Sequence, residues 1–101
     1  MSNTIQPVEG GGYINVATAT TYDEDSRWNG SNHISVAIGS QWEHETLYRT
    51  TKGSFVLHRW SQFQGSEEHW LVIDDIAAHE WLLQNGHSQQ LPEKALEAME
   101  L

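Results

Sequence analysis

Residues 46–86 decide the fold, and they read TLYRTTKGSFVLHRWSQFQGSEEHWLVIDDIAAHEWLLQNG. The first half of this stretch contains three runs rich in β-branched and aromatic side chains, which favour strands. Glycine-containing turns separate the runs, at the lengths expected of hairpins. The predicted strands are residues 46–50, 54–62 and 69–73, and the predicted turns are residues 51–53 and 64–66. Together they predict an antiparallel three-stranded meander.

A helix is predicted directly after the meander. Asp74 and Asp75 are suited to its start, because an aspartate accepts the free amides of the first turn and favours the positive end of the helix dipole. Gly86 is suited to end it after Asn85. The residues that share its apolar face are Ala77, Ala78, Trp81 and Leu82. The predicted fold class is therefore α+β, an antiparallel sheet of about four to five strands with a C-terminal helix packed on one face.

The flanking segments are predicted to complete one domain. Residues 1–12 end in three consecutive glycines, which hold no fixed backbone by themselves, so we predict a flexible N-terminal tail. A single α+β domain then covers residues 13–101, a length typical of one domain. The further predicted elements are strands at residues 13–22 and 33–38, a loop at residues 23–32 and a last helix at residues 93–101.

The chain is strongly acidic, with 14 Asp and Glu against 5 Lys and Arg and a net charge of −9. A surface of this sign repels phosphate backbones and anionic lipid. We therefore expect no direct binding to nucleic acid or to membranes, whereas a protein partner with a basic surface fits. The sequence has no cysteine, no recognisable signal peptide and no apolar run long enough to span a membrane. We predict a cytoplasmic protein with no cofactor.

Three motifs suggest a relationship to other proteins. They are GSQWEHETLY at residues 39–48, LHRWSQFQGS at residues 57–66 and AAHEWL at residues 77–82. In these motifs the chain resembles small uncharacterised proteins of bacteria and their mobile elements, over roughly residues 30–90. The resemblance implies a compact domain, but it brings no activity and no site residues with it.

Six histidines raise the question of a metal site. His44, His58 and His69 lie in or beside neighbouring predicted strands, close to carboxylates. Zinc needs three or four converging ligands, and the spacing typical of a zinc site is missing, because the H-E-x-x-H pattern would need a histidine where Leu83 stands. We predict no catalytic residues and no metal. A small metal-binding protein or hydrolase-like enzyme that uses these three histidines with nearby carboxylates stays an alternative.

Tryptophan and acidic residues suggest a binding surface. Five tryptophans exceed what one helix-on-sheet core of this size needs. They either pack inside the monomer or form a surface for a partner or a homodimer. Acidic pairs recur at strand ends and turns, where they either solubilise the chain or imitate a row of phosphates. The predicted binding residues are Asp23, Glu24, Asp25, Trp28, Trp42, Glu43, Glu45, Trp60, Glu67 and Glu68.

The resulting hypothesis is a non-enzymatic acidic binding or regulatory domain. We expect a mobile-element inhibitor that engages a basic protein surface by nucleic-acid mimicry. The hypothesis rests on the net charge of −9 and on the excess of tryptophan without a catalytic constellation. Two alternatives stay open, namely the histidine-based metal protein or enzyme and a dimeric structural accessory domain.

Overall fold

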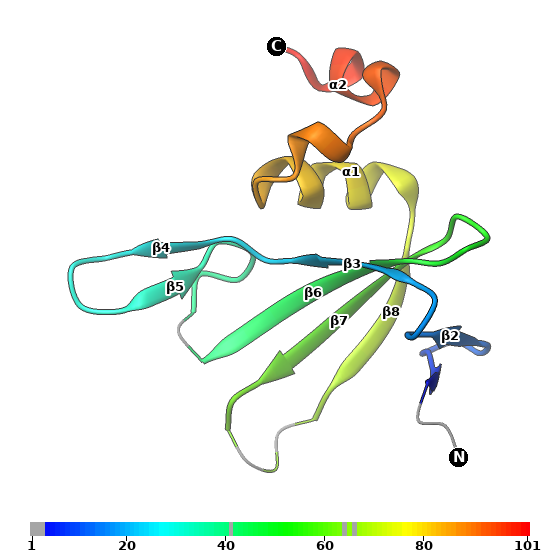
Figure 1. The fold of residues 1–101 in the computed structure, drawn as a ribbon. Coiled ribbons are helices and arrows are strands. Elements are labelled where there is room, and N and C mark those ends of the chain that lie inside the picture. Colours follow the sequence, from blue (N-terminus) through cyan, green and yellow to red (C-terminus); the bar gives the residue numbers. More distant parts are fainter. Residues whose placement is uncertain (1–3, 41, 64, 66) are drawn as a thin grey trace.

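The predicted meander forms the centre of the computed structural model, which describes residues 4–40, 42–63, 65 and 67–101 (Figure 1). Its antiparallel strands are β6 (Glu43–Arg49), β7 (Phe55–Ser61) and β8 (His69–Ile73). In the predicted first turn, Thr50 N donates to Ser54 O at 2.8 Å, and Gly53 has a φ of +89° that a residue with a Cβ rarely adopts. The second predicted turn includes positions 64 and 66, which lie outside the described residues.

The fourth strand of the sheet is β3 (Thr20–Asp23), which pairs with β6 and gives the order β3-β6-β7-β8. The prediction of one strand over residues 13–22 was wrong. The chain turns at Asn15, whose side-chain oxygen accepts from Ala17 N at 3.0 Å. Asparagine favours such turns because its side chain imitates a turn of backbone. The predicted run is therefore split into β2 (Tyr13–Asn15) and β3.

The N-terminal segment forms a hairpin with β2. Strand β1 (Ile5–Pro7) pairs antiparallel with β2. This strand lies within residues 1–12, where we predicted a flexible tail. The three glycines that suggested a tail lie in the connection between the strands, and all have positive φ. Glu9 joins the hairpin to the outer edge of β8. Its N donates to Trp70 O at 2.8 Å, and its carboxylate pairs with His69 Nδ1 at 2.7 Å.

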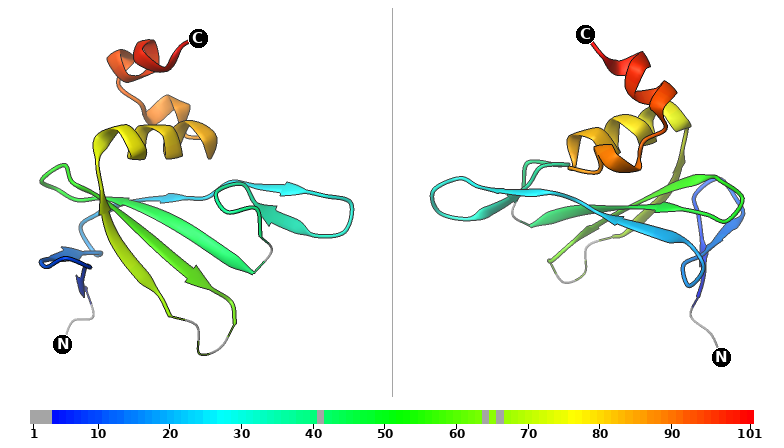
Figure 2. Two further views of the ribbon diagram at one scale, coloured as in Figure 1. Left: turned by 180° about the vertical axis from the view of Figure 1, so that it is seen from behind. Right: turned by 45° about the horizontal axis from the view of Figure 1, so that its top comes forward.

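A second hairpin projects beyond the sheet (Figures 1 and 2). Its strands are β4 (Ser26–Trp28) and β5 (His33–Ser35). We call residues 26–35 the arm. The loop predicted at residues 23–32 thus contains a strand, and the strand predicted at residues 33–38 ends early. It ends at Ser35 because Gly39 N donates back to Ser35 O at 2.6 Å and closes a turn.

Helix α1 (Asp75–Gln84) lies across one face of the sheet, as predicted (Figure 1). Asp74 is its N-cap, and the carboxylate accepts from Ala77 N at 2.8 Å. Ala77 itself is exposed, although we predicted it on the buried face. The buried core between helix and sheet consists of Leu47, Phe55, Leu57, Ala78, Trp81, Leu82 and Leu91.

The C-terminal part continues above α1. A short 3-10 turn, η1 (Ser88–Gln90), leads into helix α2 (Glu93–Met99), which ends two residues before the predicted limit. Leu91 is part of the core and Met99 packs against it, so the last helix is docked. Among the described residues, no helix has the length and apolar character needed to cross a membrane.

The strand register gives the sheet two different faces. The residues aligned across the four strands on the helix side are Tyr22, Leu47, Leu57 and Leu71. Their neighbours in sequence point to the opposite side, which we call the open face. Part of the open face is covered by the N-terminal hairpin, since Ile14 of the hairpin and Val56 of β7 are 1% and 2% exposed and line one shared groove.

Candidate functional site

A row of aromatic rings crosses the rest of the open face. In order the rings are His44, Trp60, His58, Trp70 and Tyr48, with centroids 4.6, 6.4, 3.8 and 5.5 Å apart. Neighbouring planes lie within 32° of parallel, so the rings largely cover one another's faces. Two of the surplus tryptophans are therefore used inside the monomer. They cover the sheet where no helix does.

Burial and a nearby charge act on the phenol at the end of this row. Burial raises the pKa of Tyr48, and the carboxylate of Asp23 on the adjacent strand raises it further. Desolvation and a neighbouring anion both disfavour the phenolate. The Tyr48 hydroxyl is therefore protonated over the physiological range.

The three candidate metal ligands do not share a centre. His44 and His58 lie in the aromatic row on the open face, whereas His69 is aligned with Arg59 on the helix side. Each imidazole pairs with a different carboxylate, and the pairs are His44 with Glu24, His58 with Glu68 and His69 with Glu9. Within the described ranges, no group of three or more potential ligands could hold a metal ion.

Two of the predicted binding carboxylates hold the fold together. Glu24 Oε1 accepts from Ser35 Oγ at 2.6 Å and from Glu45 N at 2.7 Å, while Oε2 bonds to His44 Nδ1. Glu24 thus ties the base of the arm to β6. Glu45 is 4% exposed and accepts from Trp81 Nε1 at 3.0 Å and from Arg59 at 3.0 and 2.7 Å. Neither carboxylate is free to meet a partner.

Four other predicted residues lie apart from one another. Asp25 lies at the base of the arm, where its N donates to Asn85 Oδ1 at 3.0 Å. Trp28 is 60% exposed on the arm, with its ring 5.1 Å from that of His33. Glu68 bonds to His58 Nε2 at 2.7 Å on the far side of the sheet, and Asp23 lies on β3. The structure therefore does not gather all ten predicted residues into one surface.

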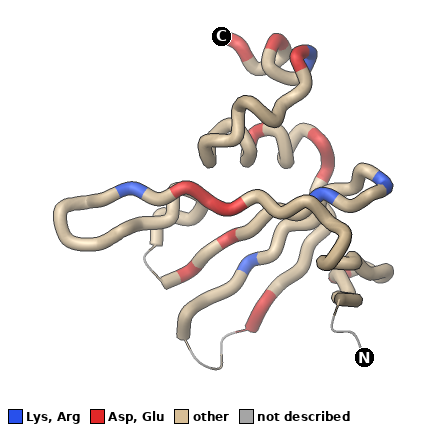
Figure 3. Tube along the Cα trace, viewed as in Figure 1, with Lys and Arg blue, Asp and Glu red and all other residues tan. Residues whose placement is uncertain are grey.

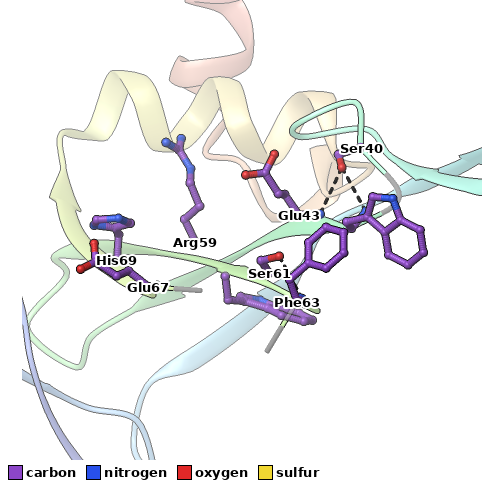
Figure 4. A pocket seen from close by; sticks show the side chains of 9 residues that line it. Ser40, Glu43, Arg59, Ser61, Phe63, Glu67 and His69 are labelled. Carbon is purple, nitrogen blue, oxygen red and sulfur yellow. Dashed lines mark hydrogen bonds between the residues drawn. The ribbon is translucent and has the colours of Figure 1, made fainter. Parts of the chain in front are cut away.

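A hollow of about 550 Å³ lies where β6 begins and β7 ends (Figure 4). It brings together four of the predicted binding residues, namely Trp42, Glu43, Trp60 and Glu67. The remaining lining residues are Ser40, Arg59, Ser61, Phe63 and His69. Figure 4 shows Glu43 and Arg59 rising from the sheet on the side of α1, with Phe63 at one end of the hollow and His69 and Glu67 at the other.

Local turns position the aromatic end of the hollow. Ser40 Oγ accepts from the backbone N of Trp42 at 3.0 Å and of Glu43 at 3.1 Å, which starts β6. Ser61 Oγ accepts from Phe63 N at 3.1 Å just after β7 ends. The rings of Trp42 and Phe63 then meet at 5.2 Å, and they are 45% and 56% exposed. The two rings therefore contact each other and stay partly exposed to solvent.

The charge of the hollow is negative. The side-chain carboxylates of Glu43 and Glu67 have no hydrogen-bond or ion-pair partner in the part of the chain that the structure describes. Arg59 also lines the hollow, but its guanidinium is already bonded to buried Glu45. The hollow therefore combines exposed aromatic surface with two unpaired carboxylates.

Comparison with models of protein families, with curated proteins and with solved structures finds no match to this chain.

The side chains themselves therefore indicate the chemistry. An exposed aromatic pair beside unpaired carboxylates suits a cationic group, because the ring face and the carboxylates both attract it. Guanidinium fits best, since its plane stacks on aromatic rings while its N–H groups bond carboxylates. Serine, histidine and glutamate all line the hollow, but His69 Nδ1 is occupied by Glu9, and no bond between a serine and a histidine is present among the described residues.

Sequence reasoning missed Phe63 and Arg59 as residues of this hollow. Phe63 lies just beyond the strand predicted at residues 54–62, and in the structure β7 ends at Ser61 and Phe63 leaves the sheet. The signal for Arg59 was its alternation with Leu57, which puts it on the helix side beside Glu45 in the register. That Glu45 lies beside Arg59 follows only from the pairing of β6 with β7, which the sequence does not show.

Proposed function

We propose that this chain is a non-enzymatic binding domain that engages a basic protein surface through the hollow. The observation that carries the proposal is that the exposed pair of Trp42 and Phe63 lines one hollow with the unpaired carboxylates of Glu43 and Glu67. In this proposal the protein acts in the cytoplasm as an inhibitor carried by a mobile element. Its carboxylates take the place of nucleic-acid phosphates on the partner.

The energetics favour a guanidinium contact of modest strength. A cation over an exposed aromatic face contributes about 0.5–1 kcal/mol, and a solvent-exposed ion pair contributes about 0.2–1 kcal/mol. One arginine that touches the ring pair and the Glu43 carboxylate would therefore gain about 0.7–2 kcal/mol, or roughly tenfold in affinity, and Glu67 at the other end of the hollow would receive a second cationic group. The net charge of −9 adds long-range attraction, which raises the association rate of a basic partner.

Calorimetric titration with two peptides tests the proposal. The probe is a nonapeptide of arginine, and the control is the same peptide with citrulline, which keeps the shape of the side chain and removes its charge. We expect measurable binding of the arginine peptide and at least about tenfold weaker binding of the citrulline peptide. Equal affinity for both peptides would remove the electrostatic basis of the proposal.

A matched pair of variants tests the location. Glu43→Gln/Glu67→Gln and Glu97→Gln/Glu100→Gln change the net charge equally, but the second pair lies on and after α2, away from the hollow. We expect the first pair to weaken binding about tenfold and the second pair to have an effect of about twofold or less. Equal effects of the two pairs would mean that the peptide senses net charge only, and the hollow would lose its role.

A further inference from the structure

The arm is an unusually exposed part of the fold. Its two strands are joined by three aligned residue pairs, and all residues of β4 are exposed. Trp28 is 60% exposed, and its ring contact is with His33 of the same arm. An isolated two-stranded hairpin is marginally stable in water, so contact with a second molecule would stabilise the arm.

The arm also differs in charge from the rest of the chain. The arm, residues 26–35, contains Arg27 and none of the 14 acidic residues, so it carries +1 and the remainder of the chain carries −10. Figure 3 shows a basic position on the projecting arm, with acidic positions at the base of the arm and along the sheet. The arm therefore has the charge that suits the hollow.

The dimensions of the molecule indicate surface that a partner would cover. A compact monomer of 11.5 kDa exposes about 5,800 Å², whereas this chain exposes 7026 Å². Its radius of gyration is 14.5 Å, against about 13 Å for a compact chain of this length. The excess, about 1,200 Å², exceeds the roughly 800 Å² that one partner contributes to an interface of standard size.

We propose that two copies of the chain associate by exchanging arms, each arm occupying the hollow of the other copy. Arg27 would enter the hollow beside the carboxylates of Glu43 and Glu67, while Trp28, on the opposite face of β4, would stay outside it. Exchange in both directions gives two identical contacts related by a two-fold axis, which closes the assembly as a dimer. The inference rests on the proposed function of the hollow as a site for cationic side chains. In the dimer the arm occupies that hollow, so a basic partner must displace the arm before it binds.

The base of the arm is fixed in a way that permits this exchange. Glu24 accepts from Ser35 Oγ at 2.6 Å, and Asn85 Oδ1 accepts from Asp25 N at 3.0 Å, so the arm is anchored to the body of its own copy. An anchored, projecting arm does not pay the entropy of ordering a loose segment when it docks. Exchange therefore needs no unfolding of either copy.

Charge exchange between variants tests the proposal by sedimentation velocity. Arg27→Glu places a carboxylate on the arm, and Glu67→Arg places a guanidinium in the hollow, so each variant alone opposes like charges in its own dimer. We expect the wild type to be a dimer in the range of about 10–100 µM and each variant to dissociate at least about tenfold more easily. An equimolar mixture should restore the dimer, because both arm–hollow contacts of the mixed pair are then of opposite charge. Circular dichroism checks that each variant is folded.

The controls separate this inference from the proposed function. Lys94→Glu makes the same change of charge as Arg27→Glu, but on α2, and it should leave the dimer intact. A wild type that is monomeric throughout this range, or a dimer that Arg27→Glu does not weaken, or a mixture that does not reassociate, would overturn arm exchange. Each of those results leaves binding of the arginine peptide unaffected. If the dimer forms as expected and the arginine peptide fails to dissociate it, the proposed partner site in the hollow is contradicted instead.

Discussion

Replacing Trp81 by phenylalanine should destabilise the domain by about 2.5–4 kcal/mol, and this change tests the contact between helix and sheet. Trp81 is 8% exposed, and its Nε1 donates to Glu45 Oε1 at 3.0 Å, where Glu45 is 4% exposed. A hydrogen bond to a charged group contributes about 1.5–3 kcal/mol. The smaller ring leaves empty space, which adds about 1 kcal/mol. The loss stays below that of a fully broken buried pair because Arg59 still bonds the other carboxylate oxygen.

Urea unfolding followed by far-UV circular dichroism measures this loss. With a denaturant slope of about 1–1.5 kcal/mol per M, the midpoint should fall by about 2 M. The matched background is Glu45→Leu, which removes the acceptor, so Trp81→Phe should then cost mainly the change of ring size. We expect a coupling energy of at least about 1.5 kcal/mol between the two substitutions. A midpoint shift below about 0.5 M, or strictly additive effects, would show that the helix is not held to β6 through this bond.

Three further predictions concern the helix start, the open face and the arm. Asp74→Ala should lower the free energy of unfolding by about 1 kcal/mol, because the Asp74 carboxylate caps Ala77 N. Asp74→Ser should restore most of the lost stability, and urea unfolding of both variants measures the two effects. Burial and then Asp23 raise the pKa of Tyr48 above its usual 10.0, so the folded state keeps a proton that the unfolded chain loses. Stability should therefore fall as the pH rises above about 10, and Tyr48→Phe should reduce that fall in unfolding measured between about pH 9 and 11. Glu24→Gln should loosen the base of the arm, so amide exchange in β4 and β5 should accelerate about tenfold while that of α1 is unchanged.

The elements that sequence could predict are those in which local pattern and tertiary role agree. Runs of β-branched and aromatic residues and the turn glycines identified β6, β7 and β8, and Asp74 with the apolar face that follows it identified α1. The flanks were mispredicted where one polar side chain redirects the chain. Asn15 breaks a run of good strand formers, and the turn at Ser35 shortens β5. Such turns depend on a single hydrogen bond, which hydrophobic periodicity does not register.

The candidate site was predictable only in part, for a reason of pairing. Trp42, Glu43 and Glu67 were selected for residue type, and the hollow does contain them. Glu24 and Glu45 were selected on the same grounds, yet each is bonded to residues distant in sequence and faces inward. Whether a carboxylate is internal or free depends on which strand lies beside it, and strand order follows from tertiary structure.

This distinction separates two roles of charge in the proposed function. Carboxylates anywhere on the chain contribute to the long-range field, which governs how fast a basic partner arrives. Only carboxylates that touch the partner, such as Glu43 and Glu67, govern how long it stays. In surface plasmon resonance with an immobilised arginine peptide, Glu97→Gln/Glu100→Gln should therefore lower the association rate and leave the dissociation rate unchanged. The decrease in association rate should become smaller as the salt concentration rises. Glu43→Gln/Glu67→Gln should raise the dissociation rate as well. If both pairs change the association rate alone, then the acidic surface attracts partners without the hollow ever holding one.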